Sequence, residues 1–375
     1  MITTRAAVLR AMGAARPYAA SRPLAIETVT LDPPGRDEVL VRIRAAGLCH
    51  SDLSVINGDR PRPMPMALGH EAAGEVEAVG DGVGDLKPGD RVVMVFMPSC
   101  GHCAPCAGGR PALCEPGAAA NGKGELLGGG RRLHLGGETL HHHLGCSAFA
   151  ERAVVSRRSL VRVPDDLPFE HAALFGCAVL TGVGAVVNTA GVKAGQSVAV
   201  VGLGGVGLAS VLGALASGAS PVVAVDLSED KLALARSLGP VRTVNAADPD
   251  AVEQVRALTG GGAEVVLEMA GSAKALEAAW KMTRRGGTTV TAGLPPPEAA
   301  LAVNIVSLVA EERTLKGSYI GTCVPSRDIP RFVGLFREGR LPVDRLLSGT
   351  AALEEINAAF DDLAEGRAVR TVISL

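Results

Sequence analysis

The stretch that decides the fold is Val198–Gly207, which reads VAVVGLGGVG. Its four apolar residues predict a buried strand, and the glycines that follow form a G-x-G-x-x-G pattern at the start of a helix. Gly202 permits a tight turn, Gly204 lets the backbone approach a pyrophosphate, and Gly207 allows close packing of helix on strand. Because the free N–H groups of the helix N-terminus would face the anion, this stretch predicts a dinucleotide site.

A second strand supports this interpretation and indicates which dinucleotide binds. Val222–Val225 ends at Asp226, nineteen residues after Gly207, and no Arg follows directly. An acid at that place accepts hydrogen bonds from the adenosine ribose and repels a 2′-phosphate, so NAD is expected rather than NADP. A glycine-rich turn without a ligand is the alternative. The predicted cofactor-binding residues of this region are Gly202, Gly204, Gly205, Val206, Gly207 and Asp226.

The pattern of apolar residues along the chain changes near Ser197. Beyond it, apolar runs alternate with helical runs, which is typical of an α/β, doubly wound parallel sheet. The predicted strands are Val198–Val201, Val222–Val225, Val265–Leu267 and Thr289–Thr291, and the predicted helices are Val206–Ala216, Lys231–Leu238, Ala251–Leu258 and Ala273–Met282.

The rest of the chain predicts a mainly β part. Its expected strands are Glu38–Ala46, Gly74–Val79, Arg91–Phe96 and Val369–Ile373, with helices at Phe169–Ala178, Ile329–Arg337 and Leu353–Ala364. The segment Glu115–Gly137 has no clear period and is expected to be a long surface loop.

Composition limits the classes of function. The 375 residues suffice for two domains, and 47% apolar with 20% charged residues indicates a globular protein. A net charge of −2 gives no case for nucleic acid or an anionic membrane. Met1–Gly13 lacks the order of a signal peptide, and five glycines make Val198–Leu215 a poor membrane span. A cytoplasmic protein with reduced cysteines is therefore expected.

Four of the eight cysteines crowd together in a C-x2-C-x2-C-x7-C pattern. Cys100, Cys103, Cys106 and Cys114 can close a tetrahedron around Zn²⁺ and leave no open position, so a structural zinc is predicted. Four unliganded thiols and an iron–sulfur cluster are the alternatives.

Several further motifs, in order, make the chain resemble the zinc-containing medium-chain alcohol dehydrogenases over nearly its whole length. These motifs are GLCHSD (Gly47–Asp52), LGHE (Leu68–Glu71), the four-cysteine lobe, HHHLG (His141–Gly145), GCAVLTGVG (Gly176–Gly184), GLGGVG with VD, and VRTV (Val369–Val372). The long segment before His141 resembles the longer, dimeric, class III-like members. The resemblance implies a GroES-like, mainly β catalytic domain over residues 1–178 and 321–375, and a Rossmann NAD-binding domain over 179–320.

The resemblance also implies a second, catalytic zinc. Cys49, His70 and Cys177, too far apart for spacing alone to link them, would hold it and leave a fourth position open. Ser51 would take the alcohol proton, Asp52 would orient His70, and Glu71 would lie close behind the metal. Two zinc ions per chain are therefore expected.

By the same resemblance, other residues contact cofactor or substrate. His50 and Arg370 match pyrophosphate contacts, Thr181 a contact near the nicotinamide, and Lys231 one to the adenosine ribose, although a solvated Lys231 is equally consistent. Phe96 and Leu144 match positions that line an apolar substrate pocket. Arg60 falls near the rim of this pocket, although a solvated loop Arg is the favoured interpretation. Ser54 stands where many relatives have a His that passes the proton to solvent, so the proton would leave through water or His50.

The expected function is reversible hydride transfer between NAD and a primary, aromatic or secondary alcohol. Some relatives oxidise S-hydroxymethyl thiol adducts and hold the thiol partly by an Arg after the lobe, but Pro116–Ala120 contains none. A zinc-stabilised NAD-binding protein without catalysis is a further alternative, with about one zinc per chain. Leu301–Gly317 resembles the strands through which relatives form homodimers, and His141, His142 and His143 are interpreted as structural residues near the substrate channel.

Overall fold

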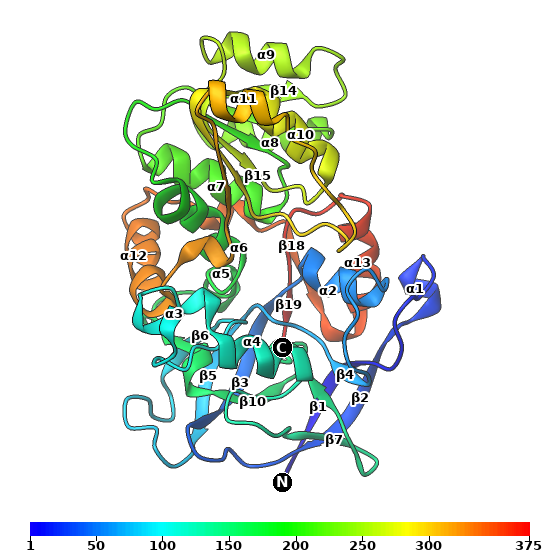
Figure 1. Cartoon of the computed structure of the whole chain (residues 1–375). Coiled ribbons are helices and arrows are strands. Elements are labelled where there is room, and N and C mark those ends of the chain that lie inside the picture. The colour runs from blue at the N-terminus through cyan, green and yellow to red at the C-terminus, as the bar shows by residue number, and fades with distance from the viewer. The chain divides into compact units, whose positions relative to one another are not determined.

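The computed structural model describes all residues, Met1–Leu375, and they form two compact units. The first unit contains Met1–Cys177, Val324–Val333 and Leu347–Leu375, and the second contains Ala178–Cys323 and Gly334–Leu346. The tail after Cys323 is therefore shared between them. Figure 1 labels the elements of both units along the chain.

The second unit is built on one six-stranded parallel sheet in the order β14-β13-β12-β15-β16-β17. This is the expected doubly wound architecture, in which the chain starts at a central strand and winds outward in both directions. Its strands are β12 (Val198–Val201), β13 (Val222–Asp226), β14 (Val241–Asn245), β15 (Ala263–Glu268), β16 (Thr283–Thr291) and β17 (Thr314–Gly317). Its helices are α6 (Ala178–Gly184), the π-helix η3 (Ala185–Ala190), α7 (Gly205–Ala216), α8 (Glu229–Ser237), α9 (Ala251–Leu258), α10 (Ala273–Met282), α11 (Ile305–Ala310) and the short η4 (Ile320–Thr322) and η5 (Val343–Leu346).

A dry core holds these helices on the sheet. Val201, Val223 and Val225 from the central strands pack with Val255 of α9 and Ala279 of α10. Strands buried on both faces need continuous apolar runs, which explains why the sequence predicted the central strands β12, β13 and β15 to within two residues at each end. The outer strands β14 and β17 were not predicted, and β16 was predicted only at its end.

The first unit contains two mainly antiparallel sheets. One has the order β8-β7-β2-β1-β4-β9, and the other has the order β11-β6-β5-β3-β19-β18, with β10 paired to β3. The strands are β1 (Ile2–Leu9), β2 (Leu24–Leu31), β3 (Glu38–Gly47), β4 (Met66–Ala67), β5 (Ala72–Val79), β6 (Arg91–Met94), β7 (Leu133–Leu135), β8 (Glu138–Thr139), β9 (His141–His142), β10 (Arg152–Ser156), β11 (Leu160–Arg162), β18 (Gly349–Ala352) and β19 (Thr371–Ser374). The helices are α1 (Tyr18–Ser21), α2 (His50–Ile56), α3 (Ala104–Ala107), α4 (Glu115–Lys123), α5 (Phe169–Leu174), α12 (Pro325–Arg337, shared with the second unit), α13 (Ile356–Ala364) and the short η1 (Pro111–Leu113), η2 (Arg157–Ser159) and η6 (Leu353–Glu355).

The prediction of a long loop at Glu115–Gly137 is wrong at the start of that segment, where helix α4 forms. The Cys114 sulfur accepts the Gly117 N–H as an N-cap, Pro116 occupies the first turn, and Gly124 ends the helix at φ +67°. Three alanines at 118–120 favour a helix but have no apolar period, because only a narrow strip of α4 is buried. A periodicity argument therefore could not detect it.

The helices of the structure are all too short or too polar to cross a bilayer.

Candidate active site

Three connections in the first unit bring a metal-binding set together. Cys49 caps α2 directly after β3, His70 and Glu71 join β4 to β5, and Cys177 follows α5. One ligand atom from each of these four residues lies within 4.8 Å of the other three. All four side chains are buried, so sequence positions 128 residues apart (49 to 177) form one enclosed cluster.

His70 offers one nitrogen to this cluster. Its Nδ1 lies 3.0 Å from Asp52 Oδ1, and its buried Nε2 has no hydrogen-bond partner. Leaving a buried polar atom without a partner costs roughly 1–3 kcal/mol, so the arrangement calls for a ligand at Nε2. Two thiols and one imidazole nitrogen are a donor set that suits Zn²⁺, and the Asp52 contact fixes which ring nitrogen remains available.

The protonation of the cluster is set by hydrogen bonds and charges between its closely spaced groups. The hydrogen bond with Cys177 is the main cause that holds the pKa of the Cys49 thiol well below its ordinary value, and it raises the pKa of Cys177 in turn. Burial alone would lower the pKa of His70, but the Asp52 carboxylate and the Cys49 sulfur raise it well above 6.5. Without a metal, one thiolate therefore stands beside an imidazolium, and a cation replaces that proton when it binds.

Glu71 and Arg370 form a second buried pair beside the thiols. Arg370 Nη1 lies 3.3 Å from Glu71 Oε2 and donates a 2.6 Å hydrogen bond to the Leu48 carbonyl. Burial raises the pKa of Glu71 to about 7, and the Arg370 guanidinium opposes that rise. The structure thus places Arg370 behind the cluster, with the Glu71 oxygens otherwise free of hydrogen bonds.

The four-cysteine lobe forms a separate cluster. The sulfurs of Cys100, Cys103, Cys106 and Cys114 lie within 4.8 Å of one another, and no disulfide joins them. Backbone N–H groups point at these sulfurs, from Cys100 to Cys114 at 3.1 Å and from Cys103 to Cys100 at 3.3 Å. Such N–H donors, above all that of His102, lower the pKa of Cys100 to about 6. The set fits a closed zinc site with four thiolates.

The glycine loop of the second unit has the shape that a pyrophosphate requires. Gly202 turns the chain at φ +90°, and a Cβ on Gly207 would lie 1.8 Å from the Gly202 carbonyl oxygen. A Cβ on Gly204 would meet nothing within 4 Å, so open space lies beside that residue. Only glycine fits at positions 202 and 207. The open space beside Gly204 leaves the approach to α7 free for a ligand.

Comparisons with known proteins identify the family of the chain. The family described as "Alcohol dehydrogenase GroES-like domain" matches residues 35–165, and "Zinc-binding dehydrogenase" matches residues 205–338. Geraniol dehydrogenase of Castellaniella defragrans is 40% identical over 99% of this chain and 98% of its own length. This chain belongs to the zinc-containing medium-chain alcohol dehydrogenase family.

Two other relatives extend the likeness over whole chains. A putative alcohol dehydrogenase D of Mycobacterium tuberculosis is 40% identical over 95% of this chain and 97% of its own. The crystal structure of benzyl alcohol dehydrogenase from Acinetobacter calcoaceticus matches with a TM-score of 0.93 and 32% identity, each chain covered completely. The chain is thus an oxidoreductase of the zinc-dependent alcohol dehydrogenase type.

In this dehydrogenase, α2 carries the residues expected around the alcohol. Ser51 lies half-buried in its first turn, and the Ser54 hydroxyl donates to the His50 carbonyl at 2.9 Å. His50 itself is exposed. Their roles toward proton and pyrophosphate stay predictions.

The expected pocket residues take different positions. Phe96 is buried with its ring edge-to-face to His70, the centroids 5.3 Å apart, and Leu144 is buried at φ +51°. Arg60, in contrast, is half-exposed, and its side chain makes no hydrogen bond or ion pair. Phe96 therefore gives His70 an apolar neighbour, whereas the Arg60 side chain has no hydrogen bond or ion pair with any of the site residues.

Asp226 ends β13 and braces the glycine loop. Its Oδ2 accepts the Leu203 N–H at 2.6 Å and its Oδ1 accepts the Ser228 N–H at 2.9 Å. Ser228 in turn caps α8, where Lys231 is half-buried, and Thr181 is buried in α6. The acid thus lies beside the loop that the fingerprint predicts for the cofactor.

Sequence reasoning missed two neighbours of the metal cluster. His143, interpreted as a structural residue near the substrate channel, places Nδ1 3.2 Å from Asp52 Oδ1, although without hydrogen-bond geometry. The charge of Arg62, rather than Arg60, acts on His143, and Arg62 Nη1 lies 3.5 Å from the Asn121 carbonyl. His142 points elsewhere and accepts the Arg132 N–H at 3.0 Å. The one available signal was the run of three histidines itself, of which His142 and His143 are both buried.

We predict that zinc affinity of the Cys49–His70–Cys177 cluster rises with pH up to at least 9.0, the ordinary pKa above which that of Cys177 is raised. Because the pKa of Cys177 lies well above 9.0 and that of His70 well above 6.5, these groups carry protons that zinc must displace. The affinity should change by about tenfold per pH unit for each proton released. Competition with a chelator at several pH values measures it, and a pH-independent affinity for this site would contradict the assignment.

Proposed function

We propose that the chain is an NAD-linked dehydrogenase for primary alcohols whose hydroxyl-bearing carbon is attached to an unsaturated carbon, as in allylic and benzylic alcohols. The buried Cys49, His70 and Cys177 donor set, with its unpartnered Nε2, carries the proposal. The substrate class draws on geraniol and benzyl alcohol, which the names of two relatives give and which share this unsaturated carbon. The buried Phe96 and Leu144 suit such an apolar group.

The chemistry divides between the chain and its bound groups. Zinc supplies a Lewis acid that favours the deprotonated alcohol, and NAD supplies the hydride acceptor. Asp52 holds the His70 ring in the orientation that leaves Nε2 for the metal. The Ser51 Oγ would accept the alcohol proton as its own hydroxyl proton passes on to water or His50, and the Phe96 ring excludes water beside His70.

We expect two zinc ions per chain, one in the cluster with His70 and one in the four-cysteine lobe. The open set would take part in the reaction, and the closed set would stabilise the lobe. The alternative of a non-catalytic, zinc-stabilised protein needs only the lobe metal. Metal analysis that found a single zinc per chain would support that alternative.

A homodimer is proposed from the surface of the second unit. The edge strand β17 is exposed along its whole length, and α11 exposes Ile305, Val306 and Val309 at 70–75%. An unpaired edge beside apolar side chains is typical of a surface that another chain covers. Sedimentation velocity should give twice the mass of the chain, and a monomer at micromolar concentration would contradict it.

A cytoplasmic location is proposed because all eight cysteines are free thiols, which a reducing compartment preserves. Fractionation that recovered the protein outside the cytoplasm would contradict it.

We predict faster turnover of allylic and benzylic primary alcohols than of saturated primary or secondary alcohols of similar size. Formaldehyde mixed with a thiol is the contrasting substrate, because the stretch after the lobe has no Arg to hold a thiol carboxylate. NADH absorbance measures kcat/KM for the whole panel. A higher kcat/KM for formaldehyde plus thiol would favour the thiol-adduct activity instead.

We predict that Asp226→Asn narrows the preference for NAD over NADP by about tenfold or more, because the carboxylate charge repels the 2′-phosphate. Asn keeps one oxygen that can accept the Leu203 N–H and loses only the acceptor of the Ser228 N–H, so the glycine loop keeps its bond to residue 226. The ratio of kcat/KM for the two cofactors measures the effect. Lys231→Gln is the control and should change that ratio less, and an unchanged ratio in Asp226→Asn would refute the cofactor assignment.

A further inference from the structure

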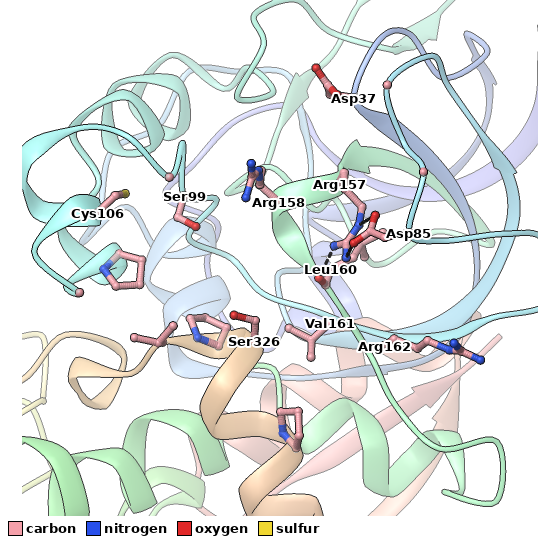
Figure 2. A pocket seen from close by; sticks show the side chains of 18 residues that line it. Asp37, Asp85, Ser99, Cys106, Arg157, Arg158, Leu160, Val161, Arg162 and Ser326 are labelled. Carbon is pink, nitrogen blue, oxygen red and sulfur yellow. Dashed lines mark hydrogen bonds and ion pairs between the residues drawn. The ribbon is translucent and has the colours of Figure 1, made fainter.

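A cavity of about 830 Å³ lies in the first unit, apart from the Cys49–His70–Cys177 cluster. Its walls come from four places: β11 with the preceding turn η2, the four-cysteine lobe, the first turns of α12, and the loops that contain Asp37 and Gly82–Asp85. Figure 2 shows these side chains around the hollow. Its volume is within the range of sites for small organic molecules.

The cavity carries one positive charge that the protein leaves uncompensated. Arg157 gives its guanidinium to Asp85 and to the Leu160 carbonyl. Arg162 pairs with Asp90 at 3.2 Å. Arg158, the next residue after Arg157, makes no side-chain hydrogen bond or ion pair. Its charge helps to lower the pKa of Asp85, but that carboxylate is already bound by Arg157.

The orientation of Arg158 leaves its donors available. A Cβ built on Gly101 would lie 3.6–3.7 Å from three atoms of the guanidinium, Nη1, Cζ and Nη2. Such equal distances mean that the flat face of the group rests against Gly101 of the lobe. Its N–H bonds, which lie in the plane of the group, therefore remain free for an acceptor.

Asp37 also lines the cavity, but its carboxylate is paired with Arg36 at 3.7 Å, and uncharged groups complete the walls. The hydroxyls of Ser99 and Ser326 line the cavity, and neither makes a hydrogen bond within the protein. Pro111, Leu160 and Val161 add an apolar surface. A planar cation with hydroxyls nearby is suited to the oxygens of a phosphate or carboxylate, and the apolar surface suits a hydrocarbon body.

We propose that this cavity binds a small organic anion with a phosphate or carboxylate head and an apolar body. The head binds Arg158, with Ser99 and Ser326 within the same walls, and the body covers Val161. Because Cys106 of the lobe also lines the cavity, the bound anion touches the lobe as well as the sheet. The site is separate from alcohol and cofactor binding, and it holds whether or not the proposed substrate class is right.

Calorimetry on the zinc-loaded protein, saturated with NADH to occupy the dinucleotide site, tests the proposal. Phenyl phosphate and phenylacetate serve as probes that share the body and differ in the head. At least one should bind, and the tighter of the two identifies the head. Arg158→Gln should weaken that binding by about tenfold or more, the scale expected when a charge-assisted hydrogen bond is lost.

Arg162→Gln is the matched control, because it removes a charge that Asp90 already compensates, and it should weaken binding by less than about threefold. Both variants should keep their zinc and their turnover, since neither residue touches the reaction. If neither probe binds, if Arg158→Gln binds as tightly as the unaltered protein, or if Arg162→Gln loses as much as Arg158→Gln, the proposal is overturned.

Discussion

The structure depends on the competition for protons among two buried thiols and one imidazole that lie close together. Cys49, Cys177 and His70 are held together without solvent, and the pKa shifts of the three groups show that each disturbs the others. A divalent cation relieves this conflict because it replaces the protons and satisfies the unpartnered Nε2. Metal binding thus follows from burial before any chemistry on a substrate is considered.

The fold supplies the rigidity that this cluster needs. Cys49 is fixed by the end of β3 and the start of α2, and Asp52, one turn on, bonds both the Cys49 N–H and the His70 ring. The Glu71–Arg370 ion pair joins the cluster to the residue just before β19. Cys49 and His70 are therefore both held by Asp52, whose own place is set by the first turn of α2.

Local patterns predicted the second unit better than the first. Val198–Val201, Ala251–Leu258 and Ala273–Met282 match their elements residue for residue, because buried parallel strands and amphipathic helices write their period directly into the sequence. The helix α4 was not predicted, because a thiol serves as its N-cap and its alanines show no apolar period.

The sites divide in the same way. The glycine loop and the four-cysteine lobe are contiguous in sequence and could be predicted from spacing. Cys49, His70 and Cys177 could be linked only through resemblance, and the approach of His143 to Asp52 exists only in the folded chain.

The most direct test of the central claim is metal content and turnover of Cys177→Ala, measured beside the unaltered protein. The account predicts that the variant keeps its circular dichroism spectrum, holds one zinc per chain in the lobe where the unaltered protein holds two, and loses alcohol oxidation. A Cys177→Ala protein that retained both zinc ions and full turnover would contradict it.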